Sequence, residues 1–344
     1  MRRLQSVDVL RTVAIVAVIV IHTTPFERPS APLGSTLDLA TAINQAMRFA
    51  VPLFFVLSGY FWAGKFNDER DLYEPTAKMF WRIAVIFIAW SAIYLIPTNF
   101  IYAFLPGASN PIKGFLSNLS GAVHRPVVTV LQGTKMHLWF LPALLWSIGI
   151  SAVLVRFRLN RLLAVIAVAT YCAGIAGKAY RDTPAGLHVT FNFRDGPFFS
   201  LIFFVTGYFL HKRVRGEHWF RLGGLIAVCG AGLHFAEVFV VHKYWGTTMQ
   251  QDYVVGTYFF GVGVALIALS DSPWLQSPRL AAIAPYVLGI YASHFMFYEM
   301  LFPLDRRFVG SPTWDVLYIV IVFLVSFALS WALARNRLTR RLVV

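Results

Sequence analysis

Long apolar segments divide this sequence into ten stretches, each close to the length of a membrane-spanning helix. An α-helix needs about 20 apolar residues to cross the hydrocarbon core of a bilayer. Such segments lie near residues 7–25, 46–64, 83–105, 137–155, 162–178, 197–211, 221–241, 253–270, 283–302 and 314–334. Charged residues make up only 13% of the 344 residues, too few to cover a soluble protein of this size. The sequence therefore predicts an all-α, polytopic membrane helix bundle that forms a single domain over residues 1–344.

The basic residues between the spans predict the orientation. With the N-terminus in the cytoplasm, the short cytoplasmic connections hold more than half of the 30 Lys and Arg residues, as the positive-inside rule requires. Ten spans then return the C-terminus to the cytoplasm. The net charge of +14 comes in short clusters without a recognised nucleic-acid-binding motif, so we expect no nucleic-acid partner. Cys172 and Cys229 lie in separate apolar runs, and we expect no metal site.

The first span carries three ionisable residues, Asp8, Arg11 and His22. Such groups cost about 2.5–3.5 kcal/mol at the centre of a span, and they are therefore candidates for function. Asp8 and Arg11 are three residues apart, so they share a helix face and can pair. Arg11 and His22 are separated by close to three turns, which places them on one face roughly 16 Å apart. Taken singly, Arg11 is equally explained as an interfacial anchor and His22 as a histidine bonded to the backbone.

Further polar candidates lie in or beside four other spans. They are Arg48, Ser58 and Gly59 in the second span, His137 and Trp139 in the fourth, Tyr291, His294 and Glu299 in the ninth, and Trp81 and Arg82 just before the third. Ser58 and Gly59 are explained either by close helix packing or by a surface that lets a ligand approach the backbone. Trp81, Arg82 and His137 also have the character of interfacial anchors.

Four segments resemble, in order, the motifs of acyltransferase family 3, the membrane O-acyltransferases of bacterial surface polysaccharides. Arg11 to His22 resembles the family's Arg-x10-His signature, and Pro52 to Tyr60 resembles its P-L-F-F-x-x-S-G-[YF] segment. His137 to Leu141 resembles its H-x-W-F-L stretch, and Gly289 to His294 resembles a late G-x-Y-x-x-H segment. Thr12 stands where the family commonly has Gly. The chain looks like the stand-alone members, which lack a C-terminal hydrolase-like domain.

The resemblance implies an enzyme of the bacterial inner membrane that moves an acyl group, most often acetyl, from acyl-CoA to a glycan hydroxyl. The acceptor would be a surface polysaccharide or its lipid-linked precursor. Acetyl-CoA would act as a co-substrate, and we expect no bound cofactor. A homo-oligomer is compatible with this reading.

The residues receive roles on that hypothesis. His22 would be the general base, because an imidazole has an ordinary pKa near 6.5. Asp8 would hold Arg11. Acyl-CoA would be bound by Arg11, Trp81, Arg82, Ser58 and Gly59, and the acceptor or the site would be supported by Arg48, His137, Trp139, Tyr291, His294 and Glu299. A covalent acyl-histidine is an alternative to direct attack by the acceptor.

Two other functions fit parts of the sequence. A transporter or flippase of a lipid-linked saccharide would explain the ten spans and the intramembrane charges, but it would not require Arg11 and His22 on one helix face. A structural partner in an envelope assembly would use the same polar residues as packing contacts.

Overall fold

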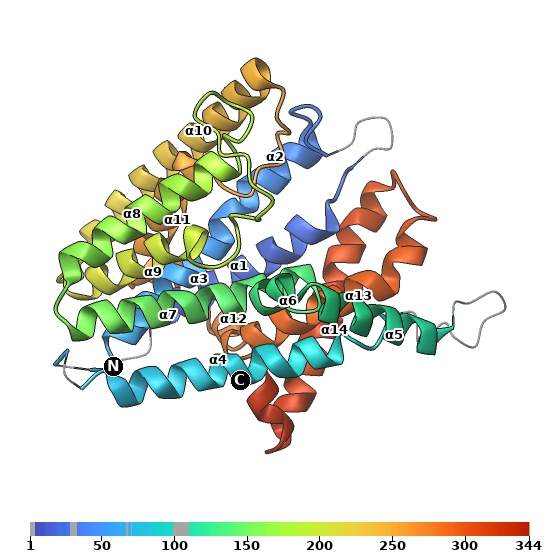
Figure 1. Ribbon diagram of the computed structural model, residues 1–344, viewed down its shortest axis with the longest axis horizontal. Coiled ribbons are helices and arrows are strands. Elements are labelled where there is room, and N and C mark those ends of the chain that lie inside the picture. The colour runs from blue at the N-terminus through green and yellow to red at the C-terminus, as the bar shows by residue number, and fades with distance from the viewer. Residues whose placement is uncertain (1–3, 28–32, 67, 70, 99–109, 344) are drawn as a thin grey trace.

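The computed structural model describes residues 4–27, 33–66, 68–69, 71–98 and 110–343, and the regular structure in these ranges is helical (Figure 1). The α-helices are α1 (Gln5–Thr23), α2 (Leu39–Ala46), α3 (Ala50–Ala63), α4 (Tyr73–Ile93), α5 (Pro111–His124), α6 (Pro126–Gln132), α7 (Phe140–Arg156), α8 (Asn160–Gly177), α9 (Pro197–His211), α10 (His218–Trp245), α11 (Val255–Leu269), α12 (Pro278–Ala281), α13 (Val287–Asp305) and α14 (Pro312–Arg335). Short 3-10 helices are η1 (Met47–Phe49), η3 (Met136–Trp139), η4 (Pro273–Leu275), η5 (Ala284–Tyr286) and η6 (Thr339–Leu342). In Figure 1, α1 lies between a group containing α8, α10 and α11 and a group containing α13 and α14.

Eight helical segments in the described residues are long and apolar enough to cross a membrane. They correspond to eight of the ten expected spans, and the sixth and eighth expected spans are the shorter helices α9 and α11, of 15 residues each. Such a helix rises only about 22 Å, less than the roughly 30 Å of the hydrocarbon core. Both are largely buried among other helices, so their ends do not have to reach the lipid headgroups. The predicted polytopic helix bundle is confirmed.

The third expected span, 83–105, was placed too late in the sequence. Helix α4 begins at Tyr73 and ends at Ile93, and residues 99–105 lie outside the described part of the chain. The exposed first turns of α4 carry Glu74 and Lys78, which form an ion pair of 2.5 Å. Charged residues therefore extend this helix beyond its apolar part, so Trp81 and Arg82 lie within α4 and not on a preceding loop.

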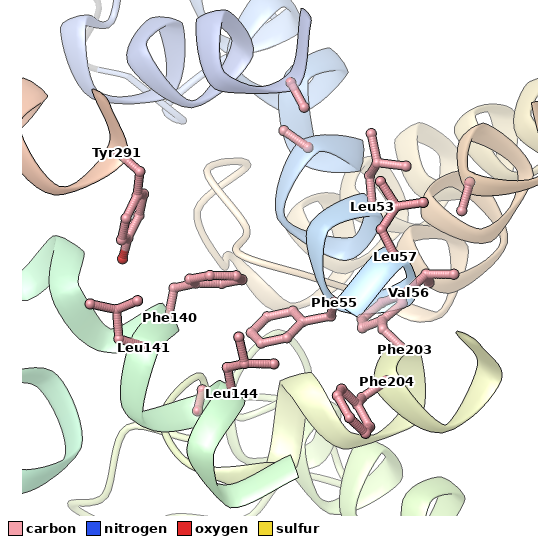
Figure 2. Close-up of a cluster of buried hydrophobic side chains, with 14 of the residues drawn as sticks. Leu53, Phe55, Val56, Leu57, Phe140, Leu141, Leu144, Phe203, Phe204 and Tyr291 are labelled. Atoms are coloured by element: carbon pink, nitrogen blue, oxygen red, sulfur yellow. The ribbon is translucent and has the colours of Figure 1, made fainter. Parts of the chain in front are cut away.

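A close contact between α3 and α9 holds the centre of the bundle together. A Cβ atom on Gly59 would lie 1.9 Å from the carbonyl oxygen of Phe204, and one on Gly207 would lie 1.9 Å from that of Val56. Only glycine allows the two backbones to come this close. Gly207 therefore lies within α9 and allows this helix to pack closely against α3. Figure 2 shows Phe55, one turn before Gly59 on α3, pointing at Phe140 of α7, with ring centroids 4.5 Å apart.

The first and last spans run in opposite directions. The backbone N–H of Phe26, just after α1, donates a hydrogen bond of 3.0 Å to the carboxylate of Asp315 in the first turn of α14. Helix α14 therefore returns toward the end of the bundle where α1 begins. We call that end the inner end and the opposite end, where α1 stops, the outer end. That the inner end faces the cytoplasm stays a prediction from the basic residues.

Candidate active site

A cavity of about 580 Å³ follows α1 from the inner end toward His22. We call it the inner cavity. Basic side chains line the part near the inner end: Arg11, Lys65, Lys78 and Arg82. Imidazole and aromatic side chains line the far part: His22, His137, Trp139, Phe140 and Tyr291. Arg11 and His22, which their spacing places on one face of α1, both line this cavity, Arg11 in its basic part and His22 in its far part. Its volume falls within the roughly 300–1,000 Å³ of small-molecule sites.

A second cavity, of about 360 Å³, lies at the outer end, and we call it the outer cavity. Its polar lining comes from η1, which precedes α3, and from the connections before α9 and α11: Arg48, Lys178, Asn192, Arg194, Gln250 and Asp252. It shares Val18, His22, Val51 and Trp139 with the inner cavity. His22 is therefore the titratable side chain at which the two cavities meet.

Three histidines from three separate segments gather at this meeting point. The ring centroids of His22 and His294 are 5.3 Å apart, and those of His294 and His137 are also 5.3 Å apart. Nδ1 of His294 lies 2.6 Å from the carbonyl oxygen of Tyr291, and Nε2 of His137 lies 3.3 Å from that of Ala292. A carbonyl oxygen only accepts, so both of these nitrogens carry the proton.

The remaining nitrogens of these two rings are consequently bare acceptors. Nε2 of His294 and Nδ1 of His137 are buried, and neither has a hydrogen-bond partner in the part of the chain that the structure describes. Buried polar atoms are rarely left unpaired. Nδ1 of His137, which lines the inner cavity, is thus available to a bound molecule, and Nε2 of His294 is available to accept a hydrogen bond from His22.

Aromatic contacts fix the positions of His137 and α13. The hydroxyl of Tyr291 donates to the carbonyl oxygen of His137, and that of Tyr94 donates to the carbonyl of Ala292 over 2.8 Å. The ring of Phe295 stacks on His137 at 4.7 Å. The H-x-W-F-L and G-x-Y-x-x-H segments, far apart in the sequence, therefore form one wall of the site.

The predicted donor-binding residues are only partly brought together. Arg11 and Arg82 both line the inner cavity, and Asp8, which is buried, interacts with the charge of Arg11. Trp81 is 65% exposed and does not line either cavity. Adjacent residues of a helix point in different directions, so with Arg82 facing the cavity its neighbour Trp81 faces away. Its position does not support the role in donor binding that the sequence suggested.

Ser58 and Gly59, also adjacent in sequence, face different surroundings. Ser58 lines the inner cavity, whereas Gly59 faces the backbone of Phe204 across the contact between α3 and α9. No ligand can approach Gly59 there, so the packing explanation fits it and the donor-binding prediction does not.

Only some of the residues predicted to bind or support the acceptor line a cavity. Arg48 lines the outer cavity and Trp139 lines both cavities. Glu299 lines neither cavity; its carboxylate is 2.6 Å from Nζ of Lys135 and accepts a hydrogen bond from Thr98 over 3.2 Å. Glu299 therefore ties α13 to two neighbouring segments at the outer end, a supporting role.

Sequence reasoning missed the charged residues that the outer connections bring to the site. Lys178, Arg194 and Asp252 are not among the candidates that the sequence alone indicates. A signal was present, because Arg194 and Asp252 each stand within three residues of the start of a short apolar helix. Burial alone would raise the pKa of Asp252, but the charges of Arg194, Lys178 and Arg48 outweigh it and hold that pKa well below its ordinary value.

Comparison with known proteins identifies the family. Residues 4–335 match acyltransferase family 3, described as an acyltransferase domain. An amino-acid racemase of Enterococcus faecalis is 25% identical over 309 residues, which cover 85% of this chain but 40% of that protein. A serine/alanine racemase of Enterococcus gallinarum is 26% identical over 233 residues, covering 61% of this chain and 29% of that protein.

The chain spans less than half the length of these relatives, so the activity in their names cannot be assigned to the part that matches. No solved structure matches the chain significantly. The family match, in contrast, covers nearly the whole sequence and includes all four motif segments. The chain belongs to acyltransferase family 3.

Proposed function

We propose that this acyltransferase moves an acyl group, most often acetyl, from acyl-CoA in the inner cavity to a hydroxyl group of a glycan in the outer cavity. The acceptor is a surface polysaccharide or its lipid-linked precursor, and the protein acts in the bacterial inner membrane. The observation that carries the proposal is that His22 lines both cavities. A donor and an acceptor that enter from opposite ends would meet at this imidazole.

The basic residues at the inner end suit the donor. Acyl-CoA is made in the cytoplasm and carries phosphate groups, which bind Arg and Lys through charge-assisted hydrogen bonds. Arg11 and Arg82 line the inner cavity together with Lys65 and Lys78. The roughly 16 Å between Arg11 and His22 along α1 would be covered by the extended pantetheine arm, which brings the thioester to His22.

The chemistry requires a base beside the acceptor. An alcohol is a weak nucleophile until its proton is removed. His22 takes the proton of the acceptor hydroxyl as the oxygen attacks the thioester carbonyl carbon. The new C–O bond forms, the C–S bond breaks, and the thiolate leaves and receives the proton from His22. The products are the acyl ester and free CoA. Formation of an acyl-His22 intermediate is the alternative order of the same steps.

His294 suits the role of a positioning residue for His22. Its bare Nε2 is a hydrogen-bond acceptor in a buried site, and its ring lies beside that of His22. Accepting an N–H from His22 would fix the tautomer and leave the other nitrogen of His22 unprotonated, ready to act as the base. This is the usual way in which a partner of a catalytic histidine orients it.

The test is acyl transfer by membranes that contain the full-length protein. Membranes with the wild type should move label from radiolabelled acetyl-CoA to a glycan, and His22→Ala should abolish this while leaving insertion and abundance intact. His188→Ala, at an exposed histidine of the connection between α8 and α9, is the matched control. Transfer by His22→Ala at the wild-type rate would exclude His22 as the base.

The alternatives give different results in the same experiment. Movement of a lipid-linked saccharide without any protein-dependent label would support a transporter or flippase. Loss of folded protein together with activity in both Arg11 and His22 variants would support a purely structural role. Acyl-His22 in the wild type, detected by mass spectrometry, would select the covalent route.

A further inference from the structure

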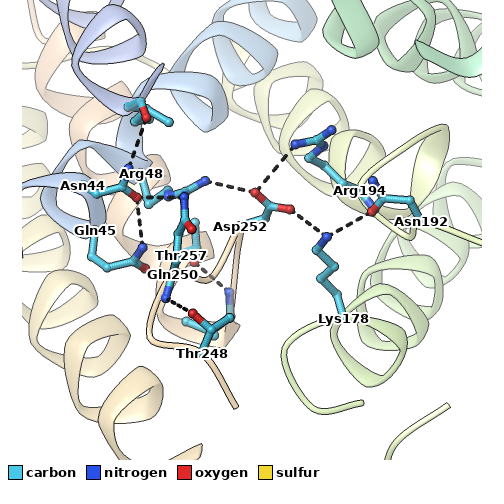
Figure 3. A network of polar contacts seen from close by, with 12 residues as sticks. Asn44, Gln45, Arg48, Lys178, Asn192, Arg194, Thr248, Gln250, Asp252 and Thr257 are labelled. Atoms are coloured by element: carbon cyan, nitrogen blue, oxygen red, sulfur yellow. Dashed lines mark hydrogen bonds and ion pairs between the residues drawn. The ribbon is translucent and has the colours of Figure 1, made fainter. Parts of the chain in front are cut away.

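The outer cavity has an excess of positive charge. Its charged lining residues, counted over the described part of the chain, are three basic side chains and one acidic side chain: Arg48, Lys178, Arg194 and Asp252. The side chains of Arg48 and Arg194 are only 10% and 13% exposed. Figure 3 shows them converging on Asp252 from separate elements. Buried cations are costly unless they are paired.

Asp252 is shared by all three cations and cannot neutralise them. Its Oδ1 lies 3.1 Å from Nη1 of Arg48 and 3.7 Å from Nη1 of Arg194, and its Oδ2 lies 3.0 Å from Nζ of Lys178. The other nearby carboxylate, Asp195, does not line the cavity. It is 3.8 Å from Nε of Arg194 and accepts a hydrogen bond from Gln132. The lining itself therefore keeps a net positive charge.

Arg48 also has donor capacity that the protein leaves unused. Its Nη1 bonds Asp252 and its Nη2 donates to Oδ1 of Asn44 over 2.8 Å, but its buried Nε has no hydrogen-bond partner among the described residues. The guanidinium of Arg194 lies over the ring of Trp139, 4.9 Å from its centroid. Trp139 also lines the inner cavity, so this pair connects the basic lining with the neighbourhood of His22.

We infer that the glycan acceptor carries an anionic group, a carboxylate or a phosphate, which Arg48, Arg194 and Lys178 bind while a nearby hydroxyl is presented to His22. Arginine matches both oxyanions because its planar donors pair with two oxygens at once. Asp252 holds the three cations in place, and the contact with the ring of Trp139 orients the guanidinium of Arg194. This inference rests on the proposed function, since it names the acceptor class of the same site.

Matched sugar probes test it on purified full-length protein in lipid nanodiscs. The probes are methyl β-D-glucuronide, glucose 6-phosphate and the neutral methyl β-D-glucoside. Binding is measured by calorimetry, and transfer is measured in parallel with radiolabelled acetyl-CoA. At least one anionic probe should bind more than about tenfold more tightly than the glucoside, as expected for charge-assisted hydrogen bonds. The preference should shrink as salt is raised. Which anionic probe binds more tightly distinguishes a carboxylate from a phosphate.

Substitutions test which residues cause the preference for anionic over neutral probes. Arg194→Gln and Lys178→Gln should each reduce it, and Arg194→Lys should retain part of it. Lys243→Gln, an exposed basic residue at the outer end of α10, should leave it unchanged. If Arg194→Gln is not recovered as a monodisperse protein, Lys178→Gln, Arg194→Lys and the salt dependence of the wild type decide the question.

The outcomes separate the two proposals. Equal binding of charged and neutral probes, or no binding of any probe, overturns the inference, even when label is transferred to the glucoside. A preference for anionic probes that the Arg194 and Lys178 variants lose supports it. The same preference without any transfer from acetyl-CoA keeps the anionic site and refutes acyl transfer.

Discussion

Replacing His294 with leucine should lower kcat by roughly 10–150-fold and leave KM for acetyl-CoA nearly unchanged. When His22 accepts the proton in the transition state it becomes an imidazolium, and its N–H then donates to the bare Nε2 of His294. Hydrogen bonds to a charged group contribute about 1.5–3 kcal/mol, and each 1.36 kcal/mol corresponds to a factor of ten in rate. The predicted fold decrease in kcat follows from these two values.

The structure explains why binding should be spared. His294 lines neither cavity, so it does not touch the proposed donor or acceptor. Its hydrogen bond with the neighbouring His22, whose ring centroid is 5.3 Å away, becomes stronger when His22 is charged. The part of this stabilisation that is gained only in the transition state, when it is lost, lowers kcat and kcat/KM equally.

The assay is steady-state transfer from labelled acetyl-CoA by three proteins, the wild type, His294→Leu and His294→Gln. Glutamine keeps an oxygen that can accept from His22, so it should recover part of kcat, whereas leucine cannot accept. Each rate is divided by the amount of folded protein recovered from size-exclusion chromatography. Equal rates for the leucine and glutamine variants, or a rise in KM without a fall in kcat, would refute the hydrogen-bond reasoning.

Two of three further predictions compare a pair of positions, and the third compares one variant with the wild type. In steady-state kinetics, Arg82→Gln should raise KM for acetyl-CoA about tenfold or more, because a charge-assisted contact with phosphate is lost. Trp81→Ala should leave this KM unchanged, because that ring faces away from the cavity. Equal effects of the two substitutions on KM would refute the placement of the donor. Gly207→Leu should lower the free energy of unfolding by about 1–3 kcal/mol or more through overpacking, and the thermal unfolding midpoint should fall with it. At Gly232 an added Cβ meets no atom within 4 Å, so Gly232→Ala should leave the midpoint unchanged. Asp252→Asn should destabilise the fold by about 3–5 kcal/mol at neutral pH, since it leaves buried cations unpaired. The lowered pKa of Asp252 means that this contribution is complete above the ordinary value of 3.8 and is lost as pH falls below it, so unfolding midpoints of the wild type and the variant should converge in acid.

The parts of the site that the sequence predicts well depend on local helix geometry. Arg11 and His22 share a face of α1 because of their spacing alone, and the structure places both on one cavity. The ten apolar segments likewise correspond to helices, because the length of an apolar run is a property of the run itself. Neither prediction requires knowledge of which helices are neighbours.

The parts that the sequence could not predict depend on distant contacts. Gly59 belongs to a motif segment, but its environment is set by Phe204, which approaches from α9. Trp81 and Arg82 are adjacent in sequence, and only the packing of α4 decides which of them faces the cavity. Lys178, Arg194 and Asp252 come from two separate connections, and their meeting with Arg48 depends on the arrangement of α3, α8, α9 and α11.

The spacing of Arg11 and His22 acquires a physical reason once both cavities are considered. Each cavity ends in a basic cluster, so a donor and an acceptor that are both anionic would compete for the same residues if the clusters were adjacent. The lining between them is largely apolar and includes Val18, Val51, Phe54 and Leu57. Such a stretch favours the uncharged acyl group and thioester over the phosphates, because transfer of an anion into an apolar environment is costly. On the proposed function, three turns of α1 therefore keep two basic regions apart while one imidazole lines both cavities.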